Sequence, residues 1–329
     1  MRQQSAYQIG IEAYGDASAL RGFAQDVPPP AAGEVQIRQT AVGVNFVDIY
    51  FRTGLHRLPQ LPGVLGAEAA GVVAALGAGV SGWQIGERVA YAGLPMGSYT
   101  NLRNVPAQRL LRLPAGVPEE TAAAALLRGA TSYMLLHRVR EIKPGDTVLV
   151  HAAAGGLGLI LVQWAKALGA RVIGTVGTPA KAALARAHGL DQAVLYRDED
   201  FVEAAREFGG GAGVDFAVDG IGGATLRRTL GAVKPFGVVA SIGEAEGAIE
   251  PITLDEIGPA RSIALARPSV LGMMMRDIDA YRVAAQQVFA RVEAGLHVEV
   301  GERLPLDDAQ QAHRRMETGQ TTGSVILIP

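Results

Sequence analysis

The 329-residue chain contains no cysteine. This absence excludes disulfide bonds, a thiol nucleophile and metal sites built on thiolates, and it leaves no reason to expect an oxidising compartment. Positive charge is not in excess, because 30 Lys and Arg face 32 Asp and Glu and the net charge is −2 at pH 7, so nucleic acid and anionic membranes are not expected partners. No apolar run approaches the roughly 18 residues of a membrane helix, and the N-terminus lacks an apolar signal core. We therefore expect a cytoplasmic protein that acts on small molecules.

The stretch from residue 146 to 170 is typical of a strand, a tight turn and a helix. A β-branched run precedes three closely spaced glycines that end at Gly158, and an apolar segment with helical spacing follows. Glycines let such a turn approach a pyrophosphate closely, and the helix N-terminus offers backbone N–H groups and a favourable dipole. Because Ala153 occupies the first position, the motif is A-x-G-x-x-G. The stretch predicts dinucleotide binding; the alternative is a glycine-rich turn that only packs a helix on a sheet.

Beyond about residue 126, short apolar strands alternate with amphipathic helices. This alternation predicts an α/β domain with a doubly wound parallel (Rossmann) sheet and right-handed crossovers. The strands are expected at residues 148–150, 171–175, 193–196, 214–218, 238–241 and 263–266, and the helices at residues 157–168, 179–188, 201–208 and 224–233.

The first part of the chain has a different pattern, with short alternating or β-branched runs separated by turn residues. It predicts a strand-rich, mostly antiparallel region, and a helix is expected to start near Pro118. A C-terminal helical pattern and two strand-like ends are expected to rejoin this region, which would make it discontinuous. Since the chain is longer than one core usually is, we predict two domains, residues 1–125 with 270–329 and residues 126–269.

The end of the second strand of the alternating region predicts the type of cofactor. When the ribose carries a free 2′-hydroxyl, an acidic residue usually stands there, but this strand ends in Val176, Gly177 and Thr178. Lys181 follows at the start of the next helix, and Tyr196 ends the third strand. Missing acid with a nearby cation favours a 2′-phosphate and hence NADPH. Alternatively, Lys181 is a solvated helix residue.

The chain resembles the zinc-independent quinone oxidoreductases of the medium-chain dehydrogenase/reductase superfamily, close to the bacterial enzymes and to zeta-crystallin. The resemblance implies a strand-rich, GroES-like catalytic domain beside the dinucleotide-binding domain, and a homodimer formed through the edge of the cofactor sheet at residues 263–266. The segments that carry it are AVGVNFVDIYFRTGLH (41–56), LPGVLGAEAAGVV (61–73), GERVAY (86–91), LLRGATSYMLL (126–136), HAAAGGLG (151–158), GTVGTPAKAALARAHG (174–189) and the ending TTGSVILIP.

The same resemblance locates the metal ligands that this chain lacks. Zinc-dependent relatives have a cysteine near the position of Asn45 and a Gly-His-Glu triplet, which here reads Gly66, Ala67 and Glu68. The six histidines are dispersed and make no metal-ligand spacing. We therefore predict no metal, and expect Glu68 to hydrogen-bond to backbone or to an arginine.

The resemblance also assigns roles to single residues. Four departures from the family pattern bear on them: His56 replaces a tyrosine, Arg128 a lysine and Gly319 an arginine, and Glu244 brings an acid near the cofactor. The residues implied at the nicotinamide and quinone end are Asn45, Tyr50 and Thr131, and those implied in cofactor binding are Gly155, Gly156, Gly177, Thr178, Lys181, Tyr196, Ser241, Gly243 and Arg267.

The function implied is NADPH-dependent reduction of quinones or related conjugated carbonyls without a metal, in which the cofactor supplies the reducing chemistry. One alternative is a zinc-free enoyl-thioester or alkenal reductase, which shares the fold and the cofactor. The other is a non-catalytic NADPH-binding protein, as crystallin and RNA-binding relatives suggest. The physiological acceptor, and transfer as a hydride or as single electrons, stay open at this stage.

Overall fold

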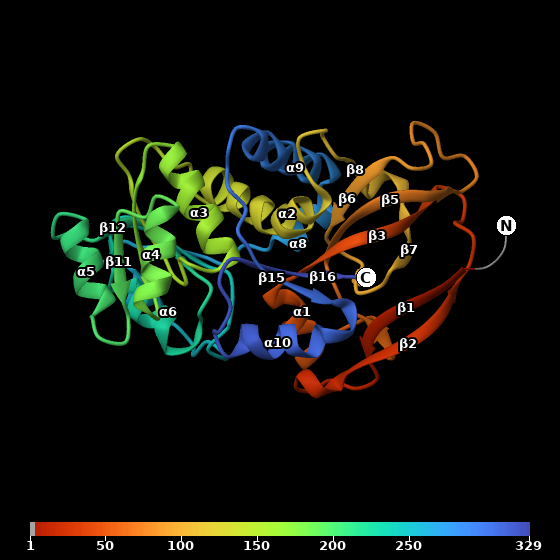
Figure 1. The fold of residues 1–329 in the computed structure, drawn as a ribbon. Helices are drawn as coiled ribbons and strands as arrows, with labels where there is room; N and C mark the ends of the chain where they lie inside the picture. The colour runs from red at the N-terminus through yellow and green to blue at the C-terminus, as the bar shows by residue number, and fades with distance from the viewer. Residues whose placement is uncertain (1–3) are drawn as a thin grey trace. The chain divides into compact units, whose positions relative to one another are not determined.

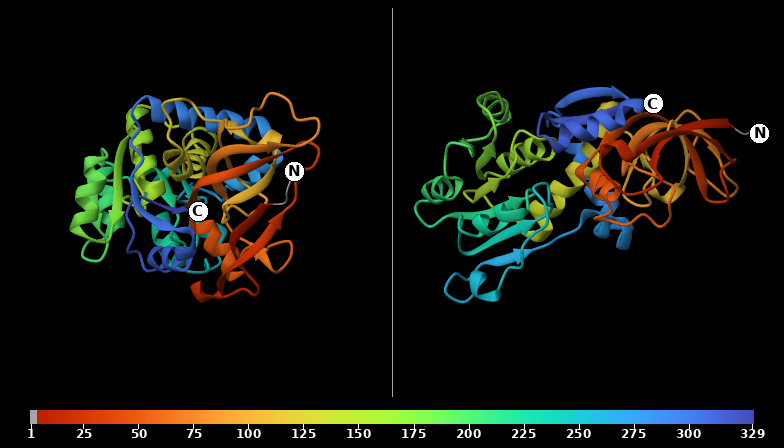
Figure 2. Two further views of the ribbon diagram at one scale, coloured as in Figure 1. Left: turned by 45° about the vertical axis from the view of Figure 1, so that its right-hand side comes forward. Right: turned by 90° about the horizontal axis from the view of Figure 1, so that it is seen from below.

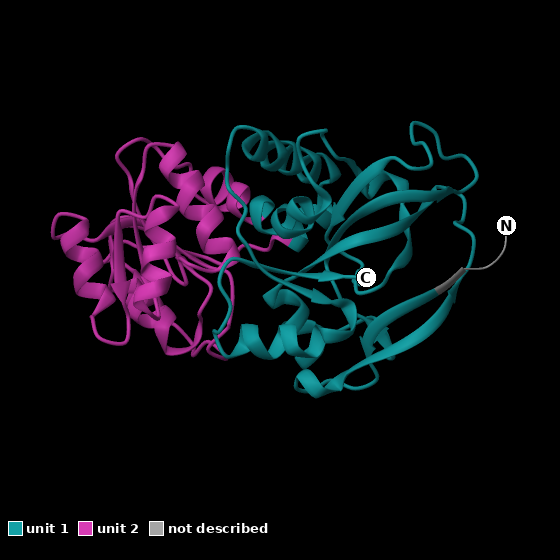
Figure 3. Cartoon of the chain, viewed as in Figure 1, with its two compact units in different colours: residues 1–130, 271–329 teal, residues 131–270 magenta. Residues whose placement is uncertain are grey.

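The computed structural model describes residues 4–329 and divides the chain into two compact units (Figure 3). Unit 1 comprises residues 1–130 and 271–329, and unit 2 comprises residues 131–270. The first boundary lies inside helix α2 (Glu119–Tyr133), five residues later than the sequence pattern placed it. A continuous helix has no change of composition at such a boundary, so the sequence does not mark it.

Unit 2 is a six-stranded sheet in the order β11-β10-β9-β12-β13-β14, and every neighbouring pair is parallel. This confirms the doubly wound sheet, with β14 at one edge (Figure 2). The strands are β9 (Thr147–Val150), β10 (Arg171–Val176), β11 (Gln192–Leu195), β12 (Val214–Asp219), β13 (Val233–Ser241) and β14 (Ala264–Ala266).

Helices alternate with these strands along the chain (Figure 1). Apolar side chains from the strands and helices form one core that includes Leu149, Ile173 and Phe201. The predicted helix at residues 224–233 ends earlier, because Val233 already begins β13. The helices are α3 (Gly156–Ala167), α4 (Pro179–Ala187), α5 (Phe201–Phe208), α6 (Gly223–Leu230) and α7 (Leu254–Ile257), and a π-helical segment (Met134–Val139) continues α2.

Unit 1 is strand-rich and largely antiparallel. Its larger sheet has the order β15-β16-β3-β5-β6-β8, with β7 also paired to β3, and its smaller sheet has the order β2-β1-β4. The C-terminal strand β16 pairs with β3, so the chain returns to this unit after unit 2. The strands are β1 (Gln4–Ile11), β2 (Leu20–Val27), β3 (Glu34–Val44), β4 (Gly63–Val64), β5 (Glu68–Leu76), β6 (Arg88–Ala92), β7 (Leu102–Pro106), β8 (Leu111–Arg112), β15 (Val300–Pro305) and β16 (Ser324–Ile328).

The helices of unit 1 include two that the sequence pattern did not single out and that matter for the site. Helix α1 (Phe46–Thr53) begins after Asn45 and ends at Gly54, whose φ of 86° needs a residue without a side chain. Helix α10 (Ala309–Glu317) precedes β16. The others are α8 (Val270–Arg276), which starts at the unit boundary, and α9 (Ile278–Glu293). Within residues 4–329, every helix is too short or too polar to traverse a bilayer.

Candidate active site

The residues expected to bind the cofactor stand at the carboxyl ends of the strands of unit 2. Parallel strands bring these ends to one edge of the sheet, and open α/β sheets bind ligands there, at the point where the strand order reverses. In this sheet the order reverses at β9, which has β10 on one side and β12 on the other. Gly155 and Gly156 follow β9, Gly177 and Thr178 follow β10, Tyr196 follows β11, Ser241 ends β13 with Gly243 after it, and Arg267 follows β14.

The turn between β9 and α3 packs tightly against its surroundings. A Cβ on Gly158 would lie 2.4 Å from the Ala152 carbonyl oxygen, so this position admits only glycine. A Cβ on Gly174 would lie 2.5 Å from the Cβ of Ala153. Gly174 in β10 therefore makes room for the alanine at the first motif position. Gly155 is the N-cap of α3 and provides no capping side chain, so the first turn of α3 keeps backbone N–H groups that suit an anion.

His151, a buried residue that the sequence analysis did not assign to the site, forms hydrogen bonds beside this turn. The ring nitrogens of His151 lie 3.0 Å from Thr175 Oγ1 and 2.9 Å from Thr229 Oγ1. The Thr229 hydroxyl donates to Asp219 at 2.7 Å, and Asp219 also accepts from the Gly222 backbone N–H. Burial lowers the pKa of His151, so the ring is held neutral at ordinary pH. These bonds connect the ends of β9, β10 and β12.

Two cations lie near one another at the ends of β10 and β11. Thr178 caps α4 by accepting from the Lys181 backbone N–H at 3.3 Å, and a Cβ on Gly177 would lie 3.3 Å from the Tyr196 hydroxyl. Partial burial and the positive charge of Arg197 lower the pKa of Lys181. Such a pKa shift means that the protein environment opposes the positive charge of Lys181, and a bound anion would relieve that opposition.

Arg267, also expected at the cofactor, is already engaged within the protein. Its guanidinium donates to Ser241 Oγ at 3.0 Å and forms an ion pair with Glu244. The Glu244 side chain is largely buried, at 14% exposure, whereas that of Arg267 is 56% exposed. The acid that the sequence analysis identified as a departure therefore neutralises an arginine at the same sheet edge.

In unit 1, Asn45 and Tyr50 lie on one short element, as the N-cap of α1 and within its second turn. Asn45 is buried, and its Nδ2 donates to Glu68 Oε1 at 2.7 Å while its backbone N–H donates to Asp48 Oδ2 at 2.8 Å. Tyr50 is half-buried, and the ring of His56 meets it edge-on with 5.6 Å between centroids. Glu68 therefore fixes the side-chain amide of Asn45, and Asp48 fixes its backbone N–H.

The prediction that Glu68 hydrogen-bonds to backbone or to an arginine is confirmed, and the structure shows both. Glu68 accepts from the Leu127 backbone N–H at 2.7 Å and from Arg128 Nη1 at 3.3 Å, in addition to Asn45. Burial raises the pKa of Glu68, while Arg128 and these donors oppose the rise. Since a guanidinium already provides the positive charge and Ala67 has no ligand atom, these residues do not fit a catalytic zinc ion.

Thr131 stands apart from these sets, because it lies in α2 at the first position of unit 2. Its part in the nicotinamide site stays a prediction. Gly319, where the family pattern has an arginine, follows α10 with a φ of 64°, a conformation that disfavours an arginine.

Comparison with known proteins places the chain in a family. Residues 31–115 match the alcohol dehydrogenase GroES-like domain, and residues 156–290 match the zinc-binding dehydrogenase family. Quinone oxidoreductase 1 of Escherichia coli strain K12 is 40% identical over 98% of this chain and its own full length. A 2-haloacrylate reductase of Burkholderia sp. is 41% identical over 92% of this chain and 93% of its own.

Solved structures agree with the sequence matches. The structure of the Escherichia coli quinone oxidoreductase complexed with NADPH superposes with a TM-score of 0.94, at 40% identity, over 98% of this chain and all of that one. A mycobacterial protein complexed with NADPH superposes with a TM-score of 0.93 at 39% identity, over 98% of this chain and all of that one.

Proposed function

The chain belongs to the quinone oxidoreductases of the medium-chain dehydrogenase/reductase family, and we propose that it oxidises NADPH and reduces quinones or related conjugated carbonyls without a metal. Relatives that carry the quinone oxidoreductase name match it over their full length. The observation that carries the choice of cofactor is the neighbouring pair Lys181 and Arg197, beside a strand end without an acidic residue. A ribose 2′-phosphate is the anion that this arrangement fits.

The residues of unit 2 would hold the cofactor by its charged parts. The uncapped N-terminus of α3 offers N–H groups to the pyrophosphate, while Thr178, Lys181 and Tyr196 offer donors and charge to the 2′-phosphate. Bound NADPH supplies the reducing equivalent from its nicotinamide ring. The protein contributes binding and orientation, and Thr131 is assigned to that end of the site by family resemblance.

The residues of unit 1 would bind the acceptor. One Nδ2 hydrogen of Asn45 is directed at Glu68, which sets the orientation of the amide, and the Tyr50 hydroxyl is a second group able to bond to an acceptor oxygen. A quinone needs little proton assistance, because its reduced form is aromatic. Orientation by two polar groups is therefore sufficient, and no acid-base residue or Lewis acid is required.

A second acceptor class is favoured by one comparison. The Burkholderia relative is named 2-haloacrylate reductase, and it matches this chain about as well as the quinone oxidoreductases do. Reduction of other electron-poor alkenes, including alkenals and enoyl thioesters, is therefore the second candidate. Both candidates use the same cofactor site.

Cofactor oxidation by purified protein tests the function. With NADPH and a panel of quinones, we expect loss of absorbance of the reduced nicotinamide, with turnover on quinones exceeding that on enones and acyl thioesters. Faster turnover on an acyl thioester would select the second candidate. Tight NADPH binding without turnover on any acceptor would refute both enzymatic functions and favour a non-catalytic role.

We further propose a cytoplasmic homodimer that binds neither nucleic acid nor membrane. Strand β14 forms one edge of the unit 2 sheet, where a second copy can add a strand, and the near-neutral net charge offers no attraction for polyanions. Light scattering at micromolar concentration is expected to give twice the 34.3 kDa chain mass. A monomeric mass would contradict the dimer.

A further inference from the structure

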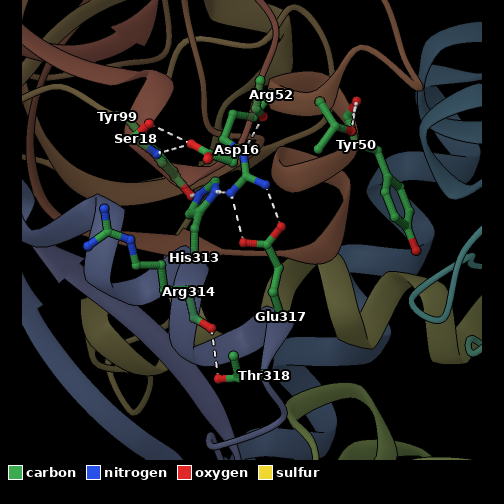
Figure 4. Close-up of polar contacts among 11 residues, drawn as sticks. Asp16, Ser18, Tyr50, Arg52, Tyr99, His313, Arg314, Glu317 and Thr318 are labelled. Atoms are coloured by element: carbon green, nitrogen blue, oxygen red, sulfur yellow. Dashed lines mark hydrogen bonds and ion pairs between the residues drawn. The ribbon is translucent and has the colours of Figure 1, made fainter.

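A chain of buried polar side chains connects helix α10 to the start of helix α1. Arg52 donates to Glu317 at 3.0 Å through Nη1 and again through Nη2, and its Nη1 lies 3.1 Å from His313 Nδ1 (Figure 4). His313 Nε2 lies 2.9 Å from the Tyr99 hydroxyl, and that hydroxyl lies 3.1 Å from Asp48 Oδ2. Tyr50 points away from this chain in the same view.

The donor inventory sets the direction of each hydrogen bond. A guanidinium only donates, so Nδ1 of His313 must accept from Arg52. Burial and the charge of Arg52 lower the pKa of His313 to about 3, so the ring is neutral and its one hydrogen is on Nε2. Nε2 then donates to the Tyr99 oxygen, which leaves the Tyr99 hydrogen to donate to Asp48. From Arg52 through His313 and Tyr99, each hydrogen bond therefore donates toward Asp48.

The chain ends beside Asn45, one of the residues that the proposed function assigns to the acceptor. Asp48 Oδ2 accepts from Tyr99 and also from the backbone N–H of Asn45. Asp48, Arg52 and His313 are fully buried, whereas Glu317 is 35% exposed. Well-packed apolar residues often stabilise a core as much as a buried ionic network does, so stability alone does not explain why this one is present.

We propose that Asp48 is a positioning residue of the reaction: the chain through Tyr99, His313 and Arg52 fixes Asp48, and Asp48 fixes the Asn45 end of α1. The Asn45 amide and the Tyr50 hydroxyl depend on that end for their direction, since both are carried by the first two turns of α1. The catalytic part of this inference rests on the proposed function; the mechanical part, from Tyr99 to Asn45, does not.

The electrostatics around Asp48 provide a readout. Asp48 Oδ1 is buried and has no partner among residues 4–329, and burial raises the pKa of Asp48 to about 7. The groups that face Asp48 from other elements are Tyr99, which lowers this pKa by donating, Glu68, which raises it, and Arg128, which lowers it. His313 contacts the Tyr99 hydroxyl, and Arg52 contacts His313, so neither bonds to Asp48 directly. Loss of the Tyr99 hydroxyl must therefore move the titration of Asp48 to higher pH.

Selective ¹⁵N-asparagine labelling makes the mechanical part observable without activity. The sequence has three asparagines, Asn45, Asn101 and Asn104, so the spectrum contains three backbone signals, and Asn101→Ser and Asn104→Ser assign them. We expect the Asn45 signal of the wild type to titrate with an apparent pKa near 7, and that of Tyr99→Phe to titrate at higher pH. An Asn45 signal that does not titrate, or titrates identically in Tyr99→Phe, overturns the inference.

Steady-state kinetics test the catalytic part with the same proteins. In Tyr99→Phe we expect kcat for a quinone to fall about tenfold with an unchanged KM for NADPH, because a small misplacement of orienting groups lowers the rate without weakening cofactor binding. His313→Leu should behave similarly, and His313→Gln, which keeps one acceptor and one donor, should restore most of kcat. A wild-type kcat and pH profile in Tyr99→Phe would overturn the catalytic part.

A matched control separates positioning from stability. Tyr281 is also fully buried, and its hydroxyl accepts from the Ala92 N–H at 3.0 Å and lies 3.1 Å from the Arg109 carbonyl oxygen. Tyr281→Phe should lower the melting temperature while leaving kcat and the Asn45 titration unchanged. Equal losses of kcat in Tyr281→Phe and Tyr99→Phe would overturn the inference. Wild-type protein that shows the Asn45 titration but reduces no acceptor would refute the proposed function alone.

Discussion

The two units differ in how their charged side chains are paired. In unit 1, the Glu68 carboxylate and the Arg128 guanidinium are both buried and bonded to each other, with further bonds to backbone and to Asn45. In unit 2, two cations, Lys181 and Arg197, lie close enough for one to lower the pKa of the other. The first arrangement is complete without a ligand, whereas the second becomes more favourable when an anion binds. The buried cluster of unit 1 is therefore preorganised, and the cation pair of unit 2 favours an anionic ligand.

The largest expected effect tests whether the charges of unit 1 depend on each other. Arg128→Met leaves the Glu68 carboxylate buried without a cation, so the free energy of unfolding should fall by about 3–5 kcal/mol. The double variant Glu68→Gln/Arg128→Met should recover most of that loss in urea denaturation. As a control, Arg303→Met breaks an exposed pair with Glu120 and should change stability by less than about 1 kcal/mol. A similar small loss in Arg128→Met would contradict the comparison.

The burial of Asp48, also in unit 1, should produce a pH dependence of stability. The folded pKa of Asp48 is raised to about 7, so this group stabilises the fold below its ordinary pKa and loses that contribution as pH rises through 7. Relative to Asp48→Asn, the wild type should lose on the order of 2 kcal/mol of unfolding free energy between pH 5 and pH 8. Parallel pH curves for the two proteins would show that Asp48 is not perturbed.

In unit 2, removal of a cation should affect one cofactor only. Lys181→Ala is expected to raise the Kd for NADPH roughly 10- to 100-fold and to leave that for NADH unchanged, because a charge-assisted bond contributes about 1.5–3 kcal/mol. Fluorescence titration with each cofactor measures this ratio. Lys166→Ala is the control, since Lys166 of α3 pairs with Asp191 and should not change the ratio. An equal loss for both cofactors would exclude the 2′-phosphate assignment.

The smallest effect concerns the ion pair between Arg267 and Glu244. Glu244→Gln removes the carboxylate that neutralises Arg267, so NADPH should bind a few times more tightly, corresponding to about 1 kcal/mol or less. The gain should shrink as salt is added, because part of the pair is exposed. Calorimetry at low and high ionic strength measures both. Weaker binding in Glu244→Gln would mean that the glutamate itself contacts the cofactor.

Most strands and helices of unit 2 were predictable because they are marked locally, whereas α7 and the π-helical segment were not predicted. The apolar strand at Thr147, the glycines up to Gly158 and the capping Thr178 each specify structure within a few residues. Helix α1 was not predicted, because Phe46 to Thr53 has a mixed pattern between β-branched runs, although Asn45 and Asp48 are suitable capping residues. The sequence also did not predict that position 174 requires glycine, because the side chain that a Cβ there would meet is that of Ala153, which lies on another element.

By itself, the sequence determined the class of the fold, the family, the absence of cysteine chemistry and the loss of the zinc ligand at Ala67. These properties depend on residue identity and on spacing along the chain. Only the tertiary structure decided that Arg128 is bonded to Glu68, that Glu244 neutralises Arg267, and that Tyr99 and His313 connect Glu317 to Asp48. Tyr99 and His313 are 214 positions apart, and hydrogen bonds depend on distance in space, which only the packed fold sets.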